Sequence, residues 1–277
     1  MTLTIATWNV NSLRRRLDLL ERLVADHNPD IVCLQETKVT DADFPTERVR
    51  EIGFPFQAVA GMPSYNGVAI LSKTPLEDVQ CHSRLDDKGA RHISAIISTK
   101  EKNIEVHSLY VPAGGNLPDP QKNPKFRYKL LFIDELSDWF AGRYGFRDPI
   151  VLAGDFNIAP LPSDVWNHKR LRRAVTHTEM EILALDRLKR SLNWIDCLRE
   201  VTPEDDPVFT WWSYRSGNWK AENKGRRLDH IWVTPALVGS IVKVEVLTDV
   251  RNWEPPSDHA PMLLEIKTDL PPLDNAR

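Results

Sequence analysis

Two carboxylates stand directly behind short apolar runs in this sequence. Asp155 follows residues 150–153 (Ile-Val-Leu-Ala) and one glycine, and Glu36 follows residues 31–34 (Ile-Val-Cys-Leu) and one glutamine. Short apolar runs bounded by Pro, Asp and Gly are typical of buried strands. Each predicted strand therefore delivers a carboxylate to its carboxyl end, which is where open α/β sheets place their ligands.

A third acidic signal lies near the C-terminus, where Asp258 and His259 precede the apolar residues 260–266. Carboxylates that converge with a histidine at strand ends can hold Mg²⁺ and a phosphate ester together. Mg²⁺ binds through one or two carboxylates, keeps several waters and leaves positions for substrate oxygens. The sequence thus predicts metal-assisted phosphoester chemistry, with Glu36 and Asp155 as its first carboxylates.

Several other polar side chains suit the same chemistry. Asn9, Asn11 and Asn157 are amides that can orient a water molecule without adding repulsive charge. His259 can donate to a phosphate oxygen when it is protonated, or accept a proton when it is neutral. Asp229 can fix the tautomer of His259, as a carboxylate does in any His–Asp pair.

The composition favours a protein of a reducing compartment. The chain has 277 residues, of which 42% are hydrophobic, and three cysteines, an odd number without metal-type spacing. Such cysteine usage argues against a secreted, disulfide-bonded protein. No signal peptide is expected, because strand-like sequence begins at Leu3, and no apolar stretch approaches the roughly 18–20 residues of a membrane span. We therefore expect a cytoplasmic protein that does not enter a membrane.

Charge is distributed unevenly along the chain. The net charge of −3 argues mildly against a surface devoted to nucleic acid, but distribution matters more than the sum. Basic residues gather at 14–16, 169–173, 187–190 and 220–227, and acidic residues gather at 41–51, 86–87 and 204–206. A polarised surface can present a basic face to phosphates, and Arg14, Arg172 and Arg173 are our candidates for such contacts.

Hydrophobic periodicity predicts strands and helices in alternation, without repeats. A strand from Leu3 places Asn9 and Asn11 on its apolar face, and Ser12 is expected to cap a helix that ends near residue 28. A long helix carries Phe126, Leu130, Ile133 and Phe140 at helical spacing, and a capping box from Thr178 to Glu181 begins another helix. Residues 66–72 and 92–98 are predicted to form an antiparallel pair, and further strands are predicted over residues 208–214, 228–234, 241–247 and 260–266.

These elements predict an α/β fold. Antiparallel-type strands in both halves of the chain, with helices between them, favour two packed sheets covered by helices over a single parallel sheet. We expect one domain over residues 1–270, followed by a loose Pro-rich tail, residues 271–277.

Seven motifs in register resemble those of exonuclease III-type apurinic/apyrimidinic endonucleases, within the endonuclease/exonuclease/phosphatase superfamily. They span nearly the whole chain and are Trp8-Asn9-Val10-Asn11, Leu34-Gln35-Glu36-Thr37-Lys38, Asn66-Gly67-Val68, Tyr110-Val111-Pro112, Gly154-Asp155-Phe156-Asn157, Arg227-Leu228-Asp229 and Ser257-Asp258-His259-Ala260-Pro261. The resemblance implies a four-layer α/β sandwich of two packed mixed β-sheets flanked by helices. It also implies Mg²⁺-dependent incision 5′ to abasic sites in duplex DNA, with 3′→5′ exonuclease and 3′-repair phosphodiesterase activity.

Carried over by position, the resemblance makes Glu36 the main metal carboxylate, with Asn11 and Asp258 as alternative ligands. Mg²⁺ is the expected ion, and Mn²⁺ is the alternative. The other residues expected around the metal are Asn9, Asp155, Asn157 and His259.

The resemblance also assigns roles in the reaction. Asp155 and Asn157 would position or activate the attacking water, while Tyr110 and His259 would contact the scissile phosphate. Asp229 would support His259. Either Asp155 or the His259–Asp229 pair could serve as the base; we favour Asp155, with His259 as an electrostatic partner of the phosphate.

Recognition of DNA is expected to rest on an apolar pocket. Trp211 and Leu228 would form its wall, because strand alternation sends Trp211 and Trp212 to opposite sides and leaves one free for substrate. Arg226 stands where some relatives have a tryptophan that lines the pocket. The expected partner is duplex DNA with abasic sites or blocked 3′ ends, bound by a monomer.

Two other functions compete with this prediction. One is a phosphomonoesterase or phospholipid phosphodiesterase on the same superfamily fold, since the metal site is shared. The segment from Phe209 to Arg227 argues against it, because aromatic residues mixed with basic ones suit a duplex with a flipped residue better than a small headgroup. The other is a catalytically silent binding protein, which is disfavoured because Glu36, Asp155, Asn157, Asp229 and His259 are all present.

Overall fold

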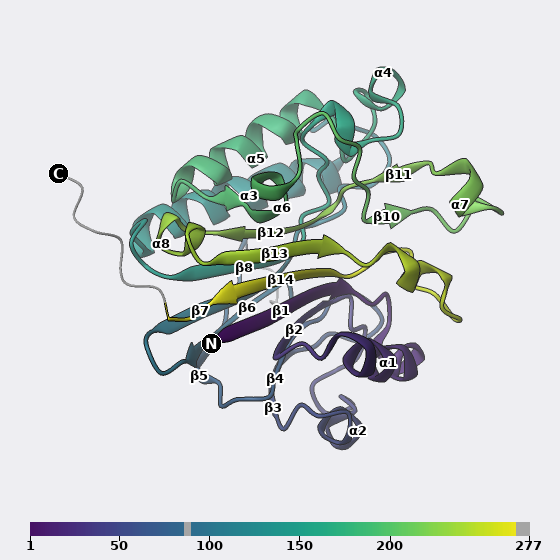
Figure 1. Cartoon of the computed structure of the whole chain (residues 1–277). Coiled ribbons are helices and arrows are strands. Elements are labelled where there is room, and N and C mark those ends of the chain that lie inside the picture. Colours follow the sequence, from purple (N-terminus) through teal and green to yellow (C-terminus); the bar gives the residue numbers. More distant parts are fainter. Residues whose placement is uncertain (86–89, 270–277) are drawn as a thin grey trace.

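Two six-stranded sheets form the centre of the computed structural model, which describes residues 1–85 and 90–269. The first sheet has the order β13-β14-β1-β2-β4-β3, and the second has the order β5-β6-β7-β8-β12-β9 (Figure 1). The strands of the first sheet are β1 (Thr2–Asn9), β2 (Ile31–Gln35), β3 (Phe56–Ala60), β4 (Val68–Ser72), β13 (Ile241–Val246) and β14 (Met262–Lys267). The strands of the second sheet are β5 (Glu77–Cys81), β6 (His92–Ser98), β7 (Asn103–Tyr110), β8 (Ile150–Asp155), β9 (Ile195–Asp196) and β12 (Asp229–Val233).

Helices cover the outer faces of the two sheets. The α-helices are α1 (Leu17–His27), α2 (Thr46–Glu51), α3 (Pro124–Arg143), α4 (His168–Leu171), α5 (Glu179–Ser191), α6 (Cys197–Val201), α7 (Trp219–Glu222) and α8 (Pro235–Val238). Three 3-10 helices, η1 (Leu13–Arg15), η2 (Pro162–Asp164) and η3 (Thr248–Asn252), and a ribbon of β10 (Trp211–Trp212) with β11 (Gly225–Arg226) complete the described elements. Within residues 1–85 and 90–269, no helix combines the length and apolar character needed to cross a membrane.

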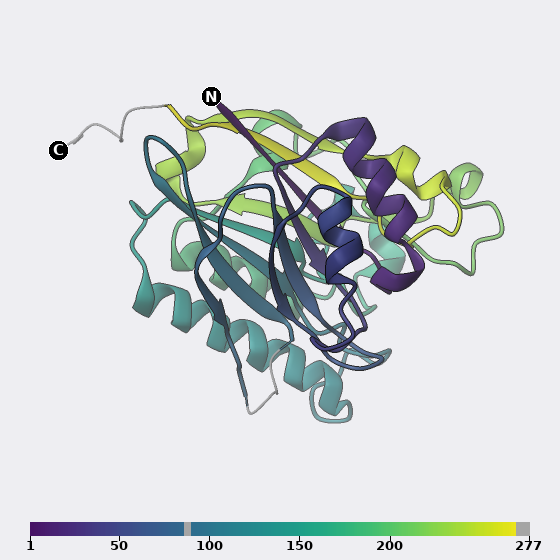
Figure 2. The same ribbon diagram turned by 90° about the horizontal axis from the view of Figure 1, so that it is seen from below.

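Three apolar cores separate four layers. The first lies between the sheets and includes Ile5, Val106 and Leu264. The second packs α1 and α2 on the first sheet, and the third packs α3 and α5 on the second sheet. Figures 1 and 2 show α1 and α3 on opposite outer faces. The predicted four-layer α/β sandwich is confirmed.

Each sheet contains one parallel pair of strands at its centre. β1 runs parallel to β2 and β7 runs parallel to β8, whereas every other pairing in the two sheets is antiparallel. A parallel pair requires a crossover, and α1 and α3 supply it in the two cases. In each parallel pair the carboxyl ends of the two strands lie side by side. The residues that follow these ends can present their side chains at the same edge of the sheet.

Three local predictions were wrong. Residues 66–72 and 92–98 do not pair: β4 pairs with β2 and β3, whereas β6 pairs with β5 and β7 in the other sheet. Both segments are apolar because they face each other across the central core, and periodicity alone does not distinguish facing strands from paired ones. The strand predicted over residues 208–214 is reduced to the two residues of β10.

The third error concerns Ser12. Its φ of 90° is left-handed, its side chain makes no capping hydrogen bond, and the helix begins only at Leu17 after a 3-10 turn. Asn11, with φ 44°, also lies beyond the strand that ends at Asn9. By contrast, the capping box between Thr178 and Glu181 is present. The predicted tail, residues 271–277, and the acidic pair 86–87 lie outside the described residues.

Candidate active site

The two parallel strand pairs deliver the predicted catalytic residues to one place. In the first sheet Asn9 is the register partner of Gln35, and Glu36 follows at once. In the second sheet Tyr110 and Asp155 are register partners, and both end their strands. The two sheets pack face to face. The side chains that meet between them are those of Asn9, Glu36, Tyr110 and Asp155.

Asn9 links the carboxylates of the two sheets. Its side-chain nitrogen donates to Glu36 Oε1 and to Asp155 Oδ2, each over 2.9 Å. An amide can satisfy one acceptor with each of its two hydrogens, so Asn9 holds both carboxylates without adding charge. Glu36 Oε1 also accepts from the Tyr110 hydroxyl over 3.0 Å, and Glu36 Oε2 pairs with Lys38 Nζ at 2.8 Å.

His259 lies between two aspartates. Its Nδ1 lies 2.8 Å from Asp229 Oδ2, and its Nε2 lies 3.7 Å from Asp155 Oδ2. Asp229 Oδ2 also accepts from the Thr210 hydroxyl over 2.6 Å. Asp229 begins β12 directly opposite Asp155 in the antiparallel register, which explains why residues so distant in sequence share this site. The structure thus brings together Asp229 and His259, the two residues of the predicted pair.

The charges of this cluster are coupled. Burial, aided by the negative charge of Asp229, raises the pKa of Asp155 to about 7, although the imidazolium of His259 opposes the shift. Burial acts against a charged His259, but the carboxylates of Asp229 and Asp155 outweigh it and raise the pKa of His259 to about 10. Near neutral pH the imidazole is therefore protonated, and Asp155 is poised to exchange a proton.

Glu36 and Tyr110 each have one protonation state near neutral pH. Burial alone would raise the pKa of Glu36, but Lys38 and the amide of Asn9 bring that pKa below its usual value. Burial and the neighbouring Glu36 raise the pKa of Tyr110 well above its usual value, so its hydroxyl keeps its hydrogen and donates it. Glu36 is thus a carboxylate and Tyr110 a neutral phenol at neutral pH.

Asp258 and Asn11 form a neighbouring polar group. Asp258 Oδ1 accepts from Asn11 Nδ2 over 3.0 Å, and Asp258 Oδ2 accepts from Trp211 Nε1 over 2.9 Å. Asn11 Oδ1 in turn accepts from Lys38 Nζ over 2.5 Å. Asn11 therefore connects Asp258 with the cation that pairs with Glu36, and it stands beside the main cluster rather than inside it.

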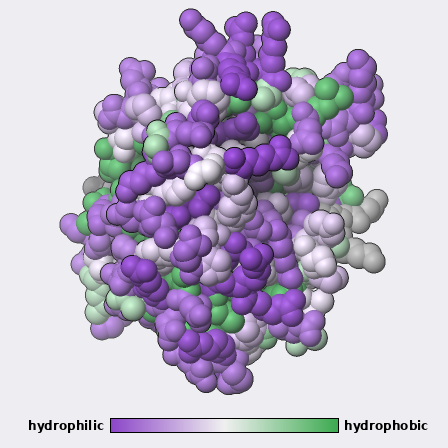
Figure 3. Space-filling view, turned by 90° about the vertical axis from the view of Figure 1, so that its right-hand side faces the viewer, coloured by the Kyte–Doolittle hydropathy of each residue, from purple (hydrophilic) through white to green (hydrophobic). Residues whose placement is uncertain are grey.

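A cavity of about 670 Å³ contains this cluster. Glu36, Tyr110, Asp155, Asn157, Asp258 and His259 line its polar side; Trp166, Val175, Trp211, Arg226 and Leu228 line another part of it. Figure 3 shows the side of the molecule that carries β10, β11 and α7, and most of its surface is hydrophilic. The cavity thus combines carboxylates with aromatic and cationic walls.

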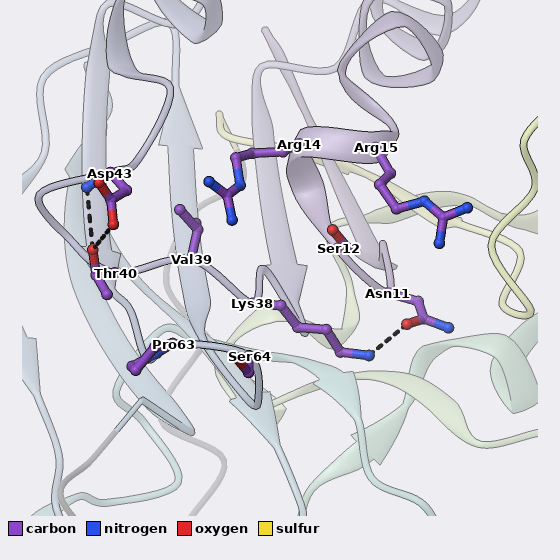
Figure 4. Close-up of a pocket in the computed structure, with 10 residues that line it drawn as sticks. All are labelled: Asn11, Ser12, Arg14, Arg15, Lys38, Val39, Thr40, Asp43, Pro63 and Ser64. Atoms are coloured by element: carbon purple, nitrogen blue, oxygen red, sulfur yellow. Dashed lines mark hydrogen bonds between the residues drawn. The ribbon is translucent and has the colours of Figure 1, made fainter.

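Asn11 and Lys38 line a second cavity, of about 380 Å³ (Figure 4), and bond to Asp258 and Glu36 of the first cavity. Arg14 and Arg15 of η1 line it opposite the loop that contains Val39 and Thr40. In Figure 4 the Arg14 side chain points toward Val39, and Lys38 reaches back to Asn11. The cavity is therefore polar and cationic next to the catalytic cluster.

Some of the residues predicted to contact DNA line the two cavities, and others do not. Trp211, Arg226 and Leu228 line the large cavity and Arg14 lines the small one. Arg172 and Arg173 are exposed beyond α4 and line neither of these cavities.

Sequence reasoning missed several residues of the site. Trp166 lines the large cavity without belonging to any pattern, and Thr210, which donates to Asp229, precedes the two tryptophans without a signal of its own. Arg227 lies fully buried, with Nε 2.7 Å from Asp164 Oδ1 and Nη1 2.7 Å from Asp196 Oδ2. These two ion pairs anchor the start of β12, which carries Asp229. Arg227 belongs to one of the seven motifs, but its partners Asp164 and Asp196 had no signal in the sequence.

The oxygen donors of the site fit a hard divalent cation. One carboxylate oxygen from each of Asp155 and Asp229 lies within 4.8 Å of the other, beside the protonated ring of His259, and Glu36 shares a donor with Asp155. Asp229 Oδ1 is buried without a hydrogen-bond partner in the described part of the chain. Carboxylate oxygens are the ligands that Mg²⁺ and Mn²⁺ prefer.

A second group of nitrogen donors, His82, His92 and His107, also lies within ligand distance. Arg84 can only donate, so its 2.7 Å contact makes His92 Nδ1 an acceptor. His92 Nε2 must then carry the hydrogen that is donated to His107 Nδ1 over 2.8 Å. The lone pairs of His92 Nδ1 and His107 Nδ1 are thus already engaged, and this group is a directed hydrogen-bond chain.

Fold and site together define the class of protein. The chain belongs to the Endonuclease/Exonuclease/phosphatase family, whose model matches residues 6–259. It is a hydrolase of a family whose nucleases depend on metal ions. The resemblance inferred from the seven motifs is confirmed.

Within this family, the chain is similar to several DNA-processing enzymes. Exodeoxyribonuclease III of Haemophilus influenzae is 31% identical over 268 residues, which cover 94% of this chain and 98% of that protein. The structure of an AP endonuclease from Archaeoglobus fulgidus matches with a TM-score of 0.87 at 33% identity, covering 95% of this chain and 98% of the other. The 3′ phosphatase NExo from Neisseria, bound to a product DNA hairpin, matches with a TM-score of 0.85 at 33% identity, covering 96% and 99%.

Proposed function

We propose that this protein is a DNA repair nuclease that hydrolyses phosphodiesters 5′ to abasic sites in duplex DNA. We also assign it 3′→5′ exonuclease and 3′-repair phosphodiesterase activity, since its relatives include an exodeoxyribonuclease III and a 3′ phosphatase. The observation that carries the proposal is the meeting of Glu36, Asp155 and His259 in one cavity with Trp211 and Arg226. The scissile phosphate needs the polar, charged part of the cavity, and the neighbouring base-free sugar needs the aromatic part beside it.

Asp155 is the proposed base. It takes a proton from the attacking water, whose oxygen forms a bond to phosphorus, and a pKa near the working pH suits that transfer. The bond from phosphorus to the 3′ oxygen breaks, and that oxygen leaves with the bonding electron pair and takes a proton from solvent water. The products are a 3′-hydroxyl on one side and a 5′-phosphate on the abasic residue. Asn157 holds Asp155 in place, because its backbone N–H donates to Asp155 Oδ1 over 2.9 Å.

His259 and Tyr110 face the phosphate. The protonated imidazole, fixed through Nδ1 by Asp229, offers Nε2–H to a non-bridging oxygen as charge develops. The hydroxyl of Tyr110 keeps its hydrogen. It donates to Glu36 in this structure and can donate to the phosphate instead when substrate is bound.

Mg²⁺ is the proposed ion, with Mn²⁺ as a substitute. Glu36 is its proposed principal ligand, with Asp258, Asn11, Asn9, Asn157 and Asp155 as the surrounding candidates. His259 was also expected near the metal, but its protonated ring has no lone pair to offer a cation, and we assign it to the phosphate. When bound, the cation neutralises charge on the phosphate oxygens.

Duplex DNA is the proposed partner. Trp211 and Leu228 would wall the pocket for the abasic sugar, beside the cationic Arg226, and Arg14 would meet a backbone phosphate from the small cavity of Figure 4. Arg172 and Arg173 would add contacts to the backbone of any duplex. We further propose a monomer, a single domain over residues 1–270, and a cytoplasmic location.

Small phosphomonoesters and phospholipid headgroups, as distinct from the 3′ ends of DNA, are the disfavoured substrate class. A small headgroup has no use for the two tryptophans and the arginine that extend the cavity beyond the carboxylates. A base-free sugar leaves the stack at little cost and fits a snug apolar wall.

The experiment is cleavage of a labelled duplex that carries one abasic analogue, with Mg²⁺, with Mn²⁺ and with a chelator. We expect one cut 5′ to the analogue, a 3′-hydroxyl end, and no cut in the chelated sample. An intact duplex with recessed 3′ ends reports exonuclease activity. Hydrolysis of p-nitrophenyl phosphate or phosphatidylinositol phosphates, without cleavage of DNA, would replace this proposal by the alternative.

A further inference from the structure

A lysine stands inside the apolar stripe of α3. Lys129 occupies a position three residues after Phe126 and four before Ile133, and both its side chain and that of its partner Glu181 are 0% exposed. An isolated buried ammonium is strongly disfavoured, so its partners must compensate for lost water. Neither residue has a role in the proposed reaction.

Lys129 contacts the catalytic loop directly. Its Nζ donates to Glu181 Oε1 over 2.5 Å and to the backbone oxygen of Asn157 over 2.7 Å. Asn157 has a left-handed φ of 54°, a conformation that costs energy for a residue with a Cβ. The bond from Lys129 holds the carbonyl of this residue, whose N–H and side chain both donate to Asp155.

Glu181 contacts another part of the cavity wall, which Val175 and Thr176 line. Its carboxylate accepts from the backbone N–H of Thr176, over 2.9 Å to each oxygen, and from the N–H and hydroxyl of Thr178. Thr176 is itself left-handed, with φ 85°, and its hydroxyl accepts from Arg226 Nη1 over 2.6 Å. One buried ion pair therefore joins the loop of Asp155 to the wall that holds Arg226, beside the backbone bond from Ala159 N–H to the Thr176 oxygen.

We propose that Lys129 and Glu181 are positioning residues for cleavage, which set the distance between the catalytic loop and the pocket wall. The pair touches no substrate and acts through Asn157 and Thr176. This inference rests on the proposed nuclease function. A merely structural pair would stabilise the fold without favouring this loop geometry.

Three variants separate positioning from stability. Lys129→Met leaves the Glu181 carboxylate buried without a cation, so the melting temperature should fall clearly. In the double variant Lys129→Met/Glu181→Gln both charges are gone, while the introduced amide oxygen can still accept from Thr176, so the melting temperature should recover. Arg187→Gln is the matched control, because Arg187 joins the same two helices through Asp134 and Asp138 on the surface.

We expect kcat on an abasic duplex to fall about 10- to 100-fold in both Lys129 variants, the usual cost of a small displacement of catalytic groups. KM should change less than about threefold, because the pair does not touch DNA and Arg226 keeps its other bond, to the Val175 oxygen. The Arg187 variant should keep both constants. Recovery of kcat together with the melting temperature in the double variant would show a merely structural pair and overturn the inference.

A second measurement does not depend on activity. Amide hydrogen exchange in the peptide around Phe156 and Ile158 should accelerate in the double variant and stay unchanged in the Arg187 variant. If the wild-type protein cleaves no DNA, the proposed function fails, and exchange alone decides the inference. Unchanged exchange in the double variant would then refute positioning, whereas faster exchange would support it.

Discussion

Asn9 donates to Asp155 across the two sheets over 2.9 Å, although the residues lie 146 positions apart in the sequence. The same amide donates to Glu36, so it is the shared donor of two carboxylates that would otherwise repel each other. Asn9→Ala removes this link. Turnover on an abasic duplex should fall about 10- to 100-fold through misplacement of both carboxylates. Steady-state kinetics beside the exposed control Asn103→Ala check this, and an unchanged kcat would show that the link is dispensable.

Asp155→Asn tests the base. The substitution keeps the shape of the side chain and removes its basicity, so turnover should fall at least about 10²–10⁴-fold, the usual worth of a general base. Affinity for the duplex should persist or increase, because a negative charge that faces a phosphate has gone. Single-turnover rates and binding curves give both quantities. Near-normal turnover would transfer the role of base to His259.

Glu36→Ala tests the metal site. Removing one carboxylate leaves too few anionic ligands to compensate for dehydration of Mg²⁺, so a higher Mg²⁺ concentration should be needed for half-maximal activity. Circular dichroism should show an intact fold. The assignment fails if the variant titrates with Mg²⁺ as the wild-type protein does.

Stability should fall in acid through the ion pairs of Arg227. Burial alone would raise the pKa values of Asp164 and Asp196, but the charge of Arg227 outweighs it and lowers both. A carboxyl whose pKa is lower when folded stabilises the protein above its unfolded pKa of about 4, and that contribution is lost as pH falls through the folded value. Asp196→Asn should therefore cost about 1–3 kcal/mol of unfolding free energy at pH 7.

Urea unfolding at pH 7, 5, 4 and 3 measures this effect. The difference between the wild-type protein and Asp196→Asn should stay constant down to about pH 4 and shrink below it. A difference that is the same at pH 7 and pH 3 would show that charge on Asp196 contributes nothing.

Trp211 has two contacts that can be separated. Its ring lines the cavity, and its Nε1 donates to Asp258. Trp211→Ala should reduce selection of abasic over intact duplex by about 1–3 kcal/mol, the worth of one aromatic contact. Trp211→Phe, which keeps a ring but loses the donor, should retain most of that selection.

Arg172→Ala/Arg173→Ala provides the comparison. It should weaken both duplexes alike and reduce the slope of log affinity against log salt by about one unit per lost phosphate contact. Binding curves for both duplexes at several salt concentrations suffice. An equal loss for intact and abasic duplexes in Trp211→Ala would rule out the pocket role.

The sequence predicted the strand ends better than the surroundings of the site. Glu36 and Asp155 were predictable because buried strands have a strong apolar signature and their carboxyl ends carry ligands. Lys129 was visible only as an anomaly within a helical stripe, since its partner Glu181 lies 52 residues away. Trp166 had no signal, because its place depends on a loop whose path is set by tertiary contacts.

Pairing between strands was the main failure. Apolar composition shows that β4 and β6 are buried, but not which neighbours they bond to, and the two strands face each other from different sheets. Asp229 and His230 are both 0% exposed at the start of β12, and local periodicity did not indicate their burial. The order of the seven motifs along the chain suggested a role for Asp229, whereas hydrophobic periodicity gave no indication of one.

The division of the site between two sheets has a consequence for synthesis of the chain on the ribosome. β14, the neighbour of β1, emerges after every other described strand, and His259 emerges just before it. A nascent chain that already displays Glu36 and Asp155 still lacks His259 and the strand that completes the first sheet. The complete set of site residues can therefore assemble only after the last described strand of the first sheet has been synthesised.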